Sequence, residues 1–131
     1  MMPGPPRPAT DYASCSRRIA RCFSSSTARR PTPLALAQLA RPYHAIIAHR
    51  LSHIEEDEAG APGYLSGGAK IVALDLPLAK LTPAAVRATA NAGRGVHHVK
   101  PRVLSLSEAT ELGTVYEVDE VSRAERSGAW L

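Results

Sequence analysis

The sequence is poor in cysteine and has no long run of apolar residues. Its two cysteines, Cys15 and Cys22, both lie near the amino terminus. No apolar stretch approaches the roughly eighteen residues of a transmembrane helix, so no membrane span is expected. If the amino-terminal segment is removed, the remaining chain has no thiol. That excludes a disulfide partner, a Cys-ligated zinc or iron–sulfur site and a Cys nucleophile.

Acidic residues are almost absent from the first 54 positions. This part holds eight arginines, no lysine and one acid, Asp11, whereas residues 55–131 hold eight basic and eleven acidic side chains. From Cys15 to Arg30 the sequence is amphipathic, rich in Arg and Ser and free of acids, as mitochondrial presequences are. We therefore predict that residues 1–30 are a disordered presequence and that the protein acts in the mitochondrial matrix. The alternative is a disordered basic tail on a cytosolic or bacterial protein.

Residues 31–131 have the composition of one small soluble domain. Of the whole chain, 44% is hydrophobic and 21% is charged. Strand and helix signals alternate over Ile71–Leu76, Thr82–Ala92, Gly95–Leu104, Ser105–Gly113 and Thr114–Val121. This alternation predicts an α+β fold, a small two-layer sandwich with strand–helix–strand–helix–strand order after the presequence.

Local sequence signals support both predicted helices. Thr82 followed by Pro83 is typical of a helix start, with threonine as the N-cap and proline at the first helical position. Ser105 and Glu108 have the spacing of a capping box. We therefore expect one helix to begin at Thr82 and a second, short helix to begin at Ser105.

The segment 43–54 can be interpreted in two ways. Its apolar residues recur at helical spacing, which favours a helix, but the two β-branched isoleucines in its middle would also suit a strand. On a helix, His49, His53 and Asp57 would share one face and could hold a divalent metal ion. The glutamate of an H-E-x-x-H motif is missing, so we predict no metal site.

A basic stretch without acids runs from Asn91 to Arg102. Its lysine and arginines could contact RNA phosphates, and its imidazoles could stack on unpaired bases. The alternative is a solvent-exposed loop and strand. The RNA-binding residues that we predict here are Arg94, His97, His98, Lys100 and Arg102.

Asp75 stands at the exit of the predicted strand 71–76. The stretch IVALDLPLAKLTPAAVRATANA is similar to the strand–Asp–helix unit of class I methyltransferases and Rossmann enzymes, in which the acid binds a ribose. Here Gly67 and Gly68 precede the strand instead of following one. This resemblance implies an alternative site for a nucleotide-type ligand, formed by Gly67, Gly68 and Asp75.

From Tyr43 onward the chain also resembles the small ribosomal large-subunit protein of the thirty family, in its mitochondrial form. YHAIIAHRLSHI is similar to the first strand of that family, TPAAVRATANAG to its first helix and GVHHVKP to its second strand. The resemblance implies a β-α-β-α-β fold bound to ribosomal RNA, with Arg50, Arg94 and Lys100 facing the RNA. Residues 55–81 would then be an insertion.

These observations together favour a non-enzymatic protein of the mitochondrial matrix, and a mitochondrial ribosomal subunit fits them best. Its expected partners are ribosomal RNA and mitoribosomal proteins, and no cofactor is expected. Two alternatives stay open. One is a small matrix enzyme or enzyme subunit with a nucleotide-type ligand near Asp75, and the other is an accessory or assembly subunit of a respiratory complex.

Overall fold

The computed structural model describes residues 20–23, 31–92 and 95–127. Its centre is one parallel sheet with the strand order β1-β4-β2-β3. The strands are β1 (Ala20–Phe23), β2 (His44–His49), β3 (Lys70–Leu74) and β4 (Lys100–Glu108). Because all strands run in the same direction, the sheet has an amino end, where the strands begin, and a carboxyl end, where they finish.

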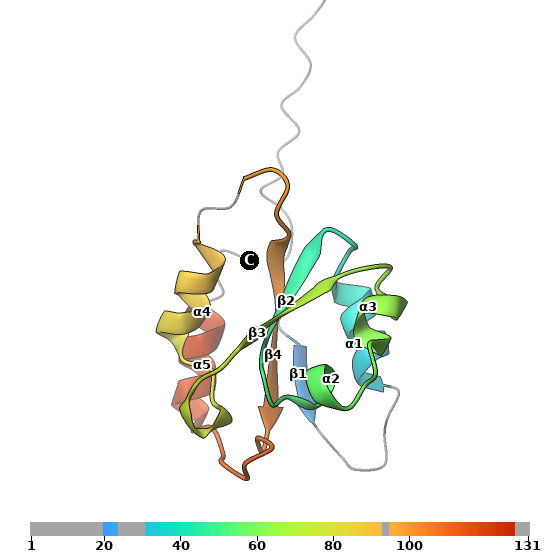
Figure 1. Cartoon of the computed structure of the whole chain (residues 1–131). Coiled ribbons are helices and arrows are strands. Elements are labelled where there is room, and N and C mark those ends of the chain that lie inside the picture. Colours follow the sequence, from blue (N-terminus) through green and yellow to red (C-terminus); the bar gives the residue numbers. More distant parts are fainter. Residues whose placement is uncertain (1–19, 24–30, 93–94, 128–131) are drawn as a thin grey trace, which may run out of the picture.

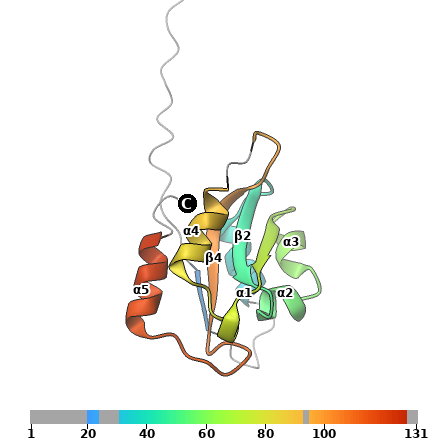
Figure 2. The same ribbon diagram turned by 60° about the vertical axis from the view of Figure 1, so that its left-hand side comes forward.

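Helices cover both faces of this sheet, as Figures 1 and 2 show. One face carries α4 (Pro83–Ala90) and α5 (Val118–Ser127). The other carries α1 (Pro31–Leu39), α2 (His53–Glu56) and α3 (Ala61–Leu65). A short 3-10 turn, η2 (Pro77–Ala79), follows β3.

Apolar side chains form one core on each face of the sheet. Ile47 and Leu104 point to the α4–α5 side, where they join Val86. Their sequence neighbours Ile46 and Val103 point to the α1–α3 side, because successive strand side chains alternate between faces. All five side chains are fully buried, and each contributes about 1.5–3 kcal/mol through burial.

The predicted small α+β fold is confirmed, but the sheet has helices on both faces, so the fold has three layers and not the two of the predicted sandwich. The expected strand–helix–strand–helix–strand order is present as well, but it begins at β2 rather than at Ile71. The predicted helix start at Thr82 is also correct, because the Thr82 hydroxyl accepts a hydrogen bond from the backbone N–H of Ala85 at 3.3 Å. Local capping chemistry was therefore sufficient to place α4.

The helix favoured for residues 43–54 is wrong, because this segment is strand β2 followed by a turn and α2. β2 lies between β4 and β3, and its residues Ala45–His49 are all buried. A central strand of a parallel sheet is covered on both faces, so it is continuously apolar and does not alternate. The apolar residues that recur at helical spacing therefore belong to two different elements, β2 and α2.

The two elements predicted for 105–121 are also wrong. Ser105 and Glu108 belong to β4, where Ser105 is buried, and they do not cap a helix. Residues 114–117 are irregular, and α5 begins at Val118. Glu120 provides the true cap, since its carboxylate accepts a hydrogen bond from the backbone N–H of Glu117 at 2.8 Å.

Part of the predicted presequence takes part in the sheet. Residues Ala20–Phe23 form β1, which pairs with β4 from Ala20 opposite Ser105 to Phe23 opposite Glu108. Residues 1–19 and 24–30 lie outside the described residues, so the presequence stays a prediction. Within the described ranges, no helix is long and apolar enough to cross a bilayer.

Candidate active site at the carboxyl end of the sheet

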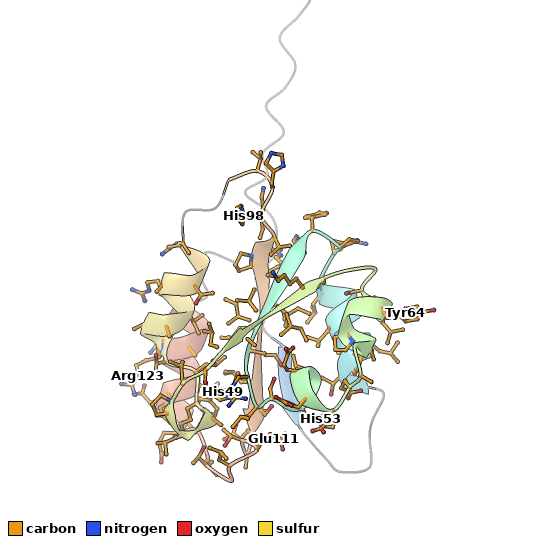
Figure 3. The ribbon with its side chains drawn as sticks, in the orientation of Figure 1. His49, His53, Tyr64, His98, Glu111 and Arg123 are labelled. Carbon is orange, nitrogen blue, oxygen red and sulfur yellow. The ribbon has the colours of Figure 1, made fainter. Side chains whose placement is uncertain are left out.

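Polar side chains gather at the carboxyl end of the sheet, where β2 and β4 finish. A small cavity of about 10 Å³, the room of about one water molecule, lies there. Its lining includes His49, Ser52, Ser105, Thr110 and Tyr116. Ligands of open parallel sheets bind outside the carboxyl ends of the strands. This end of the molecule is therefore the candidate site, and Figure 3 shows both His49 and His53 near it.

His49, the last residue of β2, is buried and ties this strand to the segment after β3. Its Nδ1 accepts a hydrogen bond from the backbone N–H of Leu51 at 3.1 Å. Its Nε2 lies 2.9 Å from the carbonyl oxygen of Leu76. If Nδ1 accepts from Leu51, the proton of a neutral ring lies on Nε2 and is donated to the Leu76 carbonyl oxygen, so the Leu76 N–H, 3.1 Å from the same Nε2, cannot donate to it as well. Because both ring nitrogens bind backbone, His49 acts as a structural clamp at this end.

His53, the first residue of α2, is the more accessible imidazole, with 32% of its side chain exposed. Its Nδ1 lies 3.3 Å from Oδ2 of Asp57, one helical turn on. Its Nε2 lies 3.1 Å from Oε1 of Glu58. A partly exposed imidazole between two carboxyl groups is an arrangement that can take up and release a proton.

Two buried polar atoms next to His53 have no hydrogen-bond partner among the described residues. They are the hydroxyl oxygen of Ser52 and Oε1 of Glu58. The short Glu58–His53 contact lacks the geometry of a hydrogen bond, which is why Oε1 counts as unsatisfied despite it. Buried polar groups usually have a partner, so unsatisfied ones mark positions with a role other than packing.

Tyr116 also lines the cavity. The Tyr116 hydroxyl accepts a hydrogen bond from the backbone N–H of Leu81 at 2.6 Å, and burial raises the pKa of this phenol. The ammonium group of Lys80 lies 5.3 Å from the Tyr116 ring centre and 2.8 Å from Oε2 of Glu120. The hydrogen bond from Lys80 lowers the pKa of Glu120. Lys80 thus contacts both the Tyr116 ring and the Glu120 carboxylate.

The loop after β4 is bonded to the turn after β3. The hydroxyl groups of Thr110 and Thr114 lie 2.7 Å apart, and the Thr114 hydroxyl donates to the carbonyl oxygen of Leu78 at 2.6 Å. Leu78 and Ala79 both have positive φ, at 62° and 54°. Such backbone conformations are costly for residues with a Cβ and concentrate near functional sites.

The predicted nucleotide site is not assembled by the fold. Asp75 follows β3 at the carboxyl end and forms an exposed ion pair with Arg50, with Nε and Oδ2 at 3.2 Å. Gly67 and Gly68 precede β3 and pack near Pro42, before β2, at the amino end. The five residues of β3 separate the two parts by about 16 Å. The three residues therefore do not surround one ligand.

The predicted RNA-binding residues are also divided between the two ends. His97, His98 and Lys100 are exposed at the amino end, where Figure 3 shows His98 far from His49 and His53. Arg50 lies at the carboxyl end. Arg102 lies in β4 and is half-buried, and Arg94 lies outside the described residues. The RNA-binding positions predicted from the sequence and from the ribosomal resemblance therefore do not form one basic surface.

Three cationic side chains lie near His44 at the amino end of β2. Burial lowers the pKa of His44, and the nearby cations Arg102, Arg41 and Lys100 lower it further. The Nδ1 of His44 accepts a hydrogen bond from the backbone N–H of Arg41 at 3.0 Å. This hydrogen bond ties the His44 ring to the turn before β2.

The family model for beta-eliminating lyases matches residues 29–128. This chain belongs to the beta-eliminating lyase family. It is 46% identical over 88 residues to the low specificity L-threonine aldolase of Pseudomonas aeruginosa and 42% identical over 88 residues to an enzyme of the same name from a Pseudomonas species. Each match covers 67% of this chain and 25% of the relative.

A solved structure agrees with this assignment to the lyase family. The threonine aldolase of Leishmania major matches with a TM-score of 0.71 and 31% sequence identity, over 76% of this chain and 28% of that one. The chain thus spans about a quarter of the length of the curated relatives it matches.

The family corrects the main functional prediction. The resemblance to a ribosomal protein is wrong, because a lyase family model covers most of the chain and a threonine aldolase shares its fold. The predictions of an RNA-binding ribonucleoprotein and of ribosomal RNA and mitoribosomal partners are wrong for the same reason. The enzyme alternative agrees better with the family. The predicted location in the mitochondrial matrix is not tested by any of these matches.

Sequence reasoning missed the residues that the fold brings together at the carboxyl end. Ser52 and Glu58 were not singled out, and His53 was considered only as a metal ligand. Among the described residues, no group of three metal-binding side chains is present. One signal was available: His53 and four acids stand directly after an apolar run, which is where a parallel strand would deliver them.

Proposed function

We propose that this chain forms the His53-containing part of a lyase of the threonine aldolase type, which breaks the Cα–Cβ bond of a β-hydroxy amino acid. The observation that carries the proposal is the family match over residues 29–128, within which His53 lies at the carboxyl end of the sheet. The named relatives are threonine aldolases, and we extend their substrate to this chain as part of the proposal.

The reaction needs a group that takes a proton from the substrate hydroxyl. Cleavage of L-threonine turns its β-hydroxyl into the carbonyl of acetaldehyde and leaves glycine, so the hydroxyl proton must move to a base. His53 is the partly exposed imidazole of the site, and Asp57 and Glu58 flank its two nitrogens. An imidazole is the commonest general base in proteins and is active near neutral pH. We assign that proton transfer to His53.

The described residues do not form a complete binding site for the cofactor of the family. This family of enzymes depends on pyridoxal phosphate, which binds through a lysine amine. The lysines of the chain are Lys70, Lys80 and Lys100. Lys70 and Lys100 begin strands at the amino end, and Lys80 is bound to Glu120. We therefore assign no residue of this chain to the cofactor and derive no step from it.

A chimeric enzyme tests the proposal. Residues 29–128 would replace the matching segment of the Pseudomonas aeruginosa enzyme, and glycine and acetaldehyde would be measured with L-threonine as substrate. We expect the chimera to be active and His53→Asn to reduce kcat at least about 100-fold, as loss of a general base does.

The matched control is His97→Asn, which changes an exposed imidazole at the amino end and should leave kcat within about twofold. Equal losses in the two variants, or full activity of His53→Asn, would refute the assignment of His53. A folded but inactive chimera would refute the proposed reaction.

A further inference from the structure

We infer that Glu58 is a positioning residue, which fixes the orientation and the tautomer of the His53 ring. The inference deepens the proposed function, on which it rests for the role of His53. What points to it is a contact: the buried carboxyl oxygen Oε1 of Glu58 lies 3.1 Å from Nε2 of His53.

The burial of Glu58 is the first argument. This residue is 8% exposed, although glutamate is almost never buried without a partner, since burying a carboxyl group is costly. Its Oε1 has no hydrogen bond within the described residues, and the His53 ring is the polar group beside it. The site therefore places an acceptor where one nitrogen of His53 can donate.

The local backbone is the second argument, because it holds Glu58 in place. The Glu58 carbonyl oxygen accepts a hydrogen bond from the backbone N–H of Ala61 at 2.8 Å. The next two residues, Ala59 and Gly60, have positive φ, at 47° and 79°, and turn the chain from α2 into α3. Glu58 is thus fixed in a tight connection and is less free to move than a residue at a helix surface.

The third argument is the contrast with Asp57, the other carboxyl group at the ring. Asp57 is 61% exposed and shares a hydrogen bond of 3.3 Å with Nδ1 of His53, for which water competes. The contact with Glu58 is shorter and shielded from water, and a hydrogen bond there is stronger. A neutral imidazole carries one proton. Asp57 and Glu58 therefore compete for that proton, and we expect it on Nε2, facing the buried Glu58, rather than on Nδ1, facing the exposed Asp57.

Nuclear magnetic resonance of the full 131-residue chain tests this directly, without substrate or cofactor. Long-range ¹H–¹⁵N spectra of histidine-labelled protein at about pH 9 report the tautomer of each imidazole, and the signal that His53→Gln removes identifies His53. We expect mostly the Nε2–H form in the wild type. Glu58→Ala should lower the ratio of Nε2–H to Nδ1–H about tenfold, and Glu58→Gln about threefold because a neutral acceptor is weaker.

Glu56→Gln is the matched control, since it removes a negative charge from an exposed position of α2. It should leave the tautomer ratio of His53 unchanged. An unchanged ratio in both Glu58 variants would overturn the inference. So would an equal shift in Glu56→Gln, because charge at a distance would then explain the effect. Collapse of all histidine signals in both Glu58 variants would also overturn it, since Glu58 would then serve stability alone.

The inference and the proposed function fail in different experiments. If the chimera is inactive but the Glu58 variants change the His53 tautomer, the positioning role stands and the reaction is wrong. If the chimera is active and the tautomer does not respond, the reaction stands and Glu58 is not a positioning residue.

Discussion

At the carboxyl end of the sheet, His49, Ser52 and Glu58 are buried, whereas His97, His98 and Lys100 at the amino end are exposed. The two ends carry similar residue types. They differ in where those residues come from in the sequence. The cavity at the carboxyl end is lined by segments as far apart as β2 and Tyr116, whereas the exposed residues at the amino end belong to one stretch of chain. A group of polar residues in the sequence is thus a poor guide to a site, and convergence in space is a better one.

The largest contrast between the two ends should come from their histidines. His49→Ala removes a buried ring whose two nitrogens bind the backbone of Leu51 and Leu76, and it leaves those backbone groups unsatisfied. We expect the free energy of unfolding to fall by about 3 kcal/mol. His98→Ala, at the exposed end, should change it by less than about 0.5 kcal/mol. Urea denaturation measures both, and similar values would remove the distinction between the two ends.

The amino end nevertheless contains one position that tolerates little change. Gly67 has φ +75°, and a Cβ there would lie 3.3 Å from Cγ of Pro42. Gly67→Ala should therefore lower the free energy of unfolding by about 1–2 kcal/mol. The control is Gly95→Ala, where nothing lies within 4 Å of the added Cβ. A neutral Gly67→Ala would show that this turn is not fixed.

A second stability test at the carboxyl end removes the hydroxyl group of Tyr116. Tyr116→Phe leaves the ring in its buried place but takes the acceptor from the backbone N–H of Leu81. We expect a loss of about 1–1.5 kcal/mol in the free energy of unfolding, the net value of such a bond. Tyr64→Phe, which changes a phenol that is 85% exposed, should have no measurable effect in the same denaturation experiment.

The smallest expected effect is a pH dependence next to the candidate site. The pKa of Glu120 is lowered in the folded protein, first by its hydrogen bond from Lys80. Its contribution to stability is therefore present above its ordinary pKa of 4.5 and is lost as the pH falls through the lower folded value. In Lys80→Met the loss of stability between neutral pH and about pH 3 should be smaller.

Arg87→Met is the control for that measurement, because it removes a positive charge from the exposed surface of α4. Thermal unfolding over the acid range follows both variants. If both flatten the pH dependence equally, net charge and not the Lys80–Glu120 pair accounts for it.

The helix and strand predictions were correct where local capping chemistry determines the structure, and they were wrong where pairing with a neighbouring strand determines it. Thr82 and Pro83 place a helix start by capping chemistry that needs no tertiary contact, and α4 begins there. Ser105 and Glu108 have the spacing of a cap as well, but they pair with Ala20 and Phe23 of β1, and this pairing keeps them in strand β4. Local propensity is a weak influence compared with a full set of strand hydrogen bonds.

The sequence by itself determined the mixture of helices and strands, the lack of a membrane-spanning run and the start of α4, because composition and capping act over a few neighbouring residues. The tertiary structure decided that Ser52 lines the same cavity as Ser105 and Tyr116 while Gly67 and Asp75 lie apart. The physical reason is that parallel strands deliver their ends to one side of a sheet whatever their separation in the chain. Only the order of strands in space shows which residues share that side.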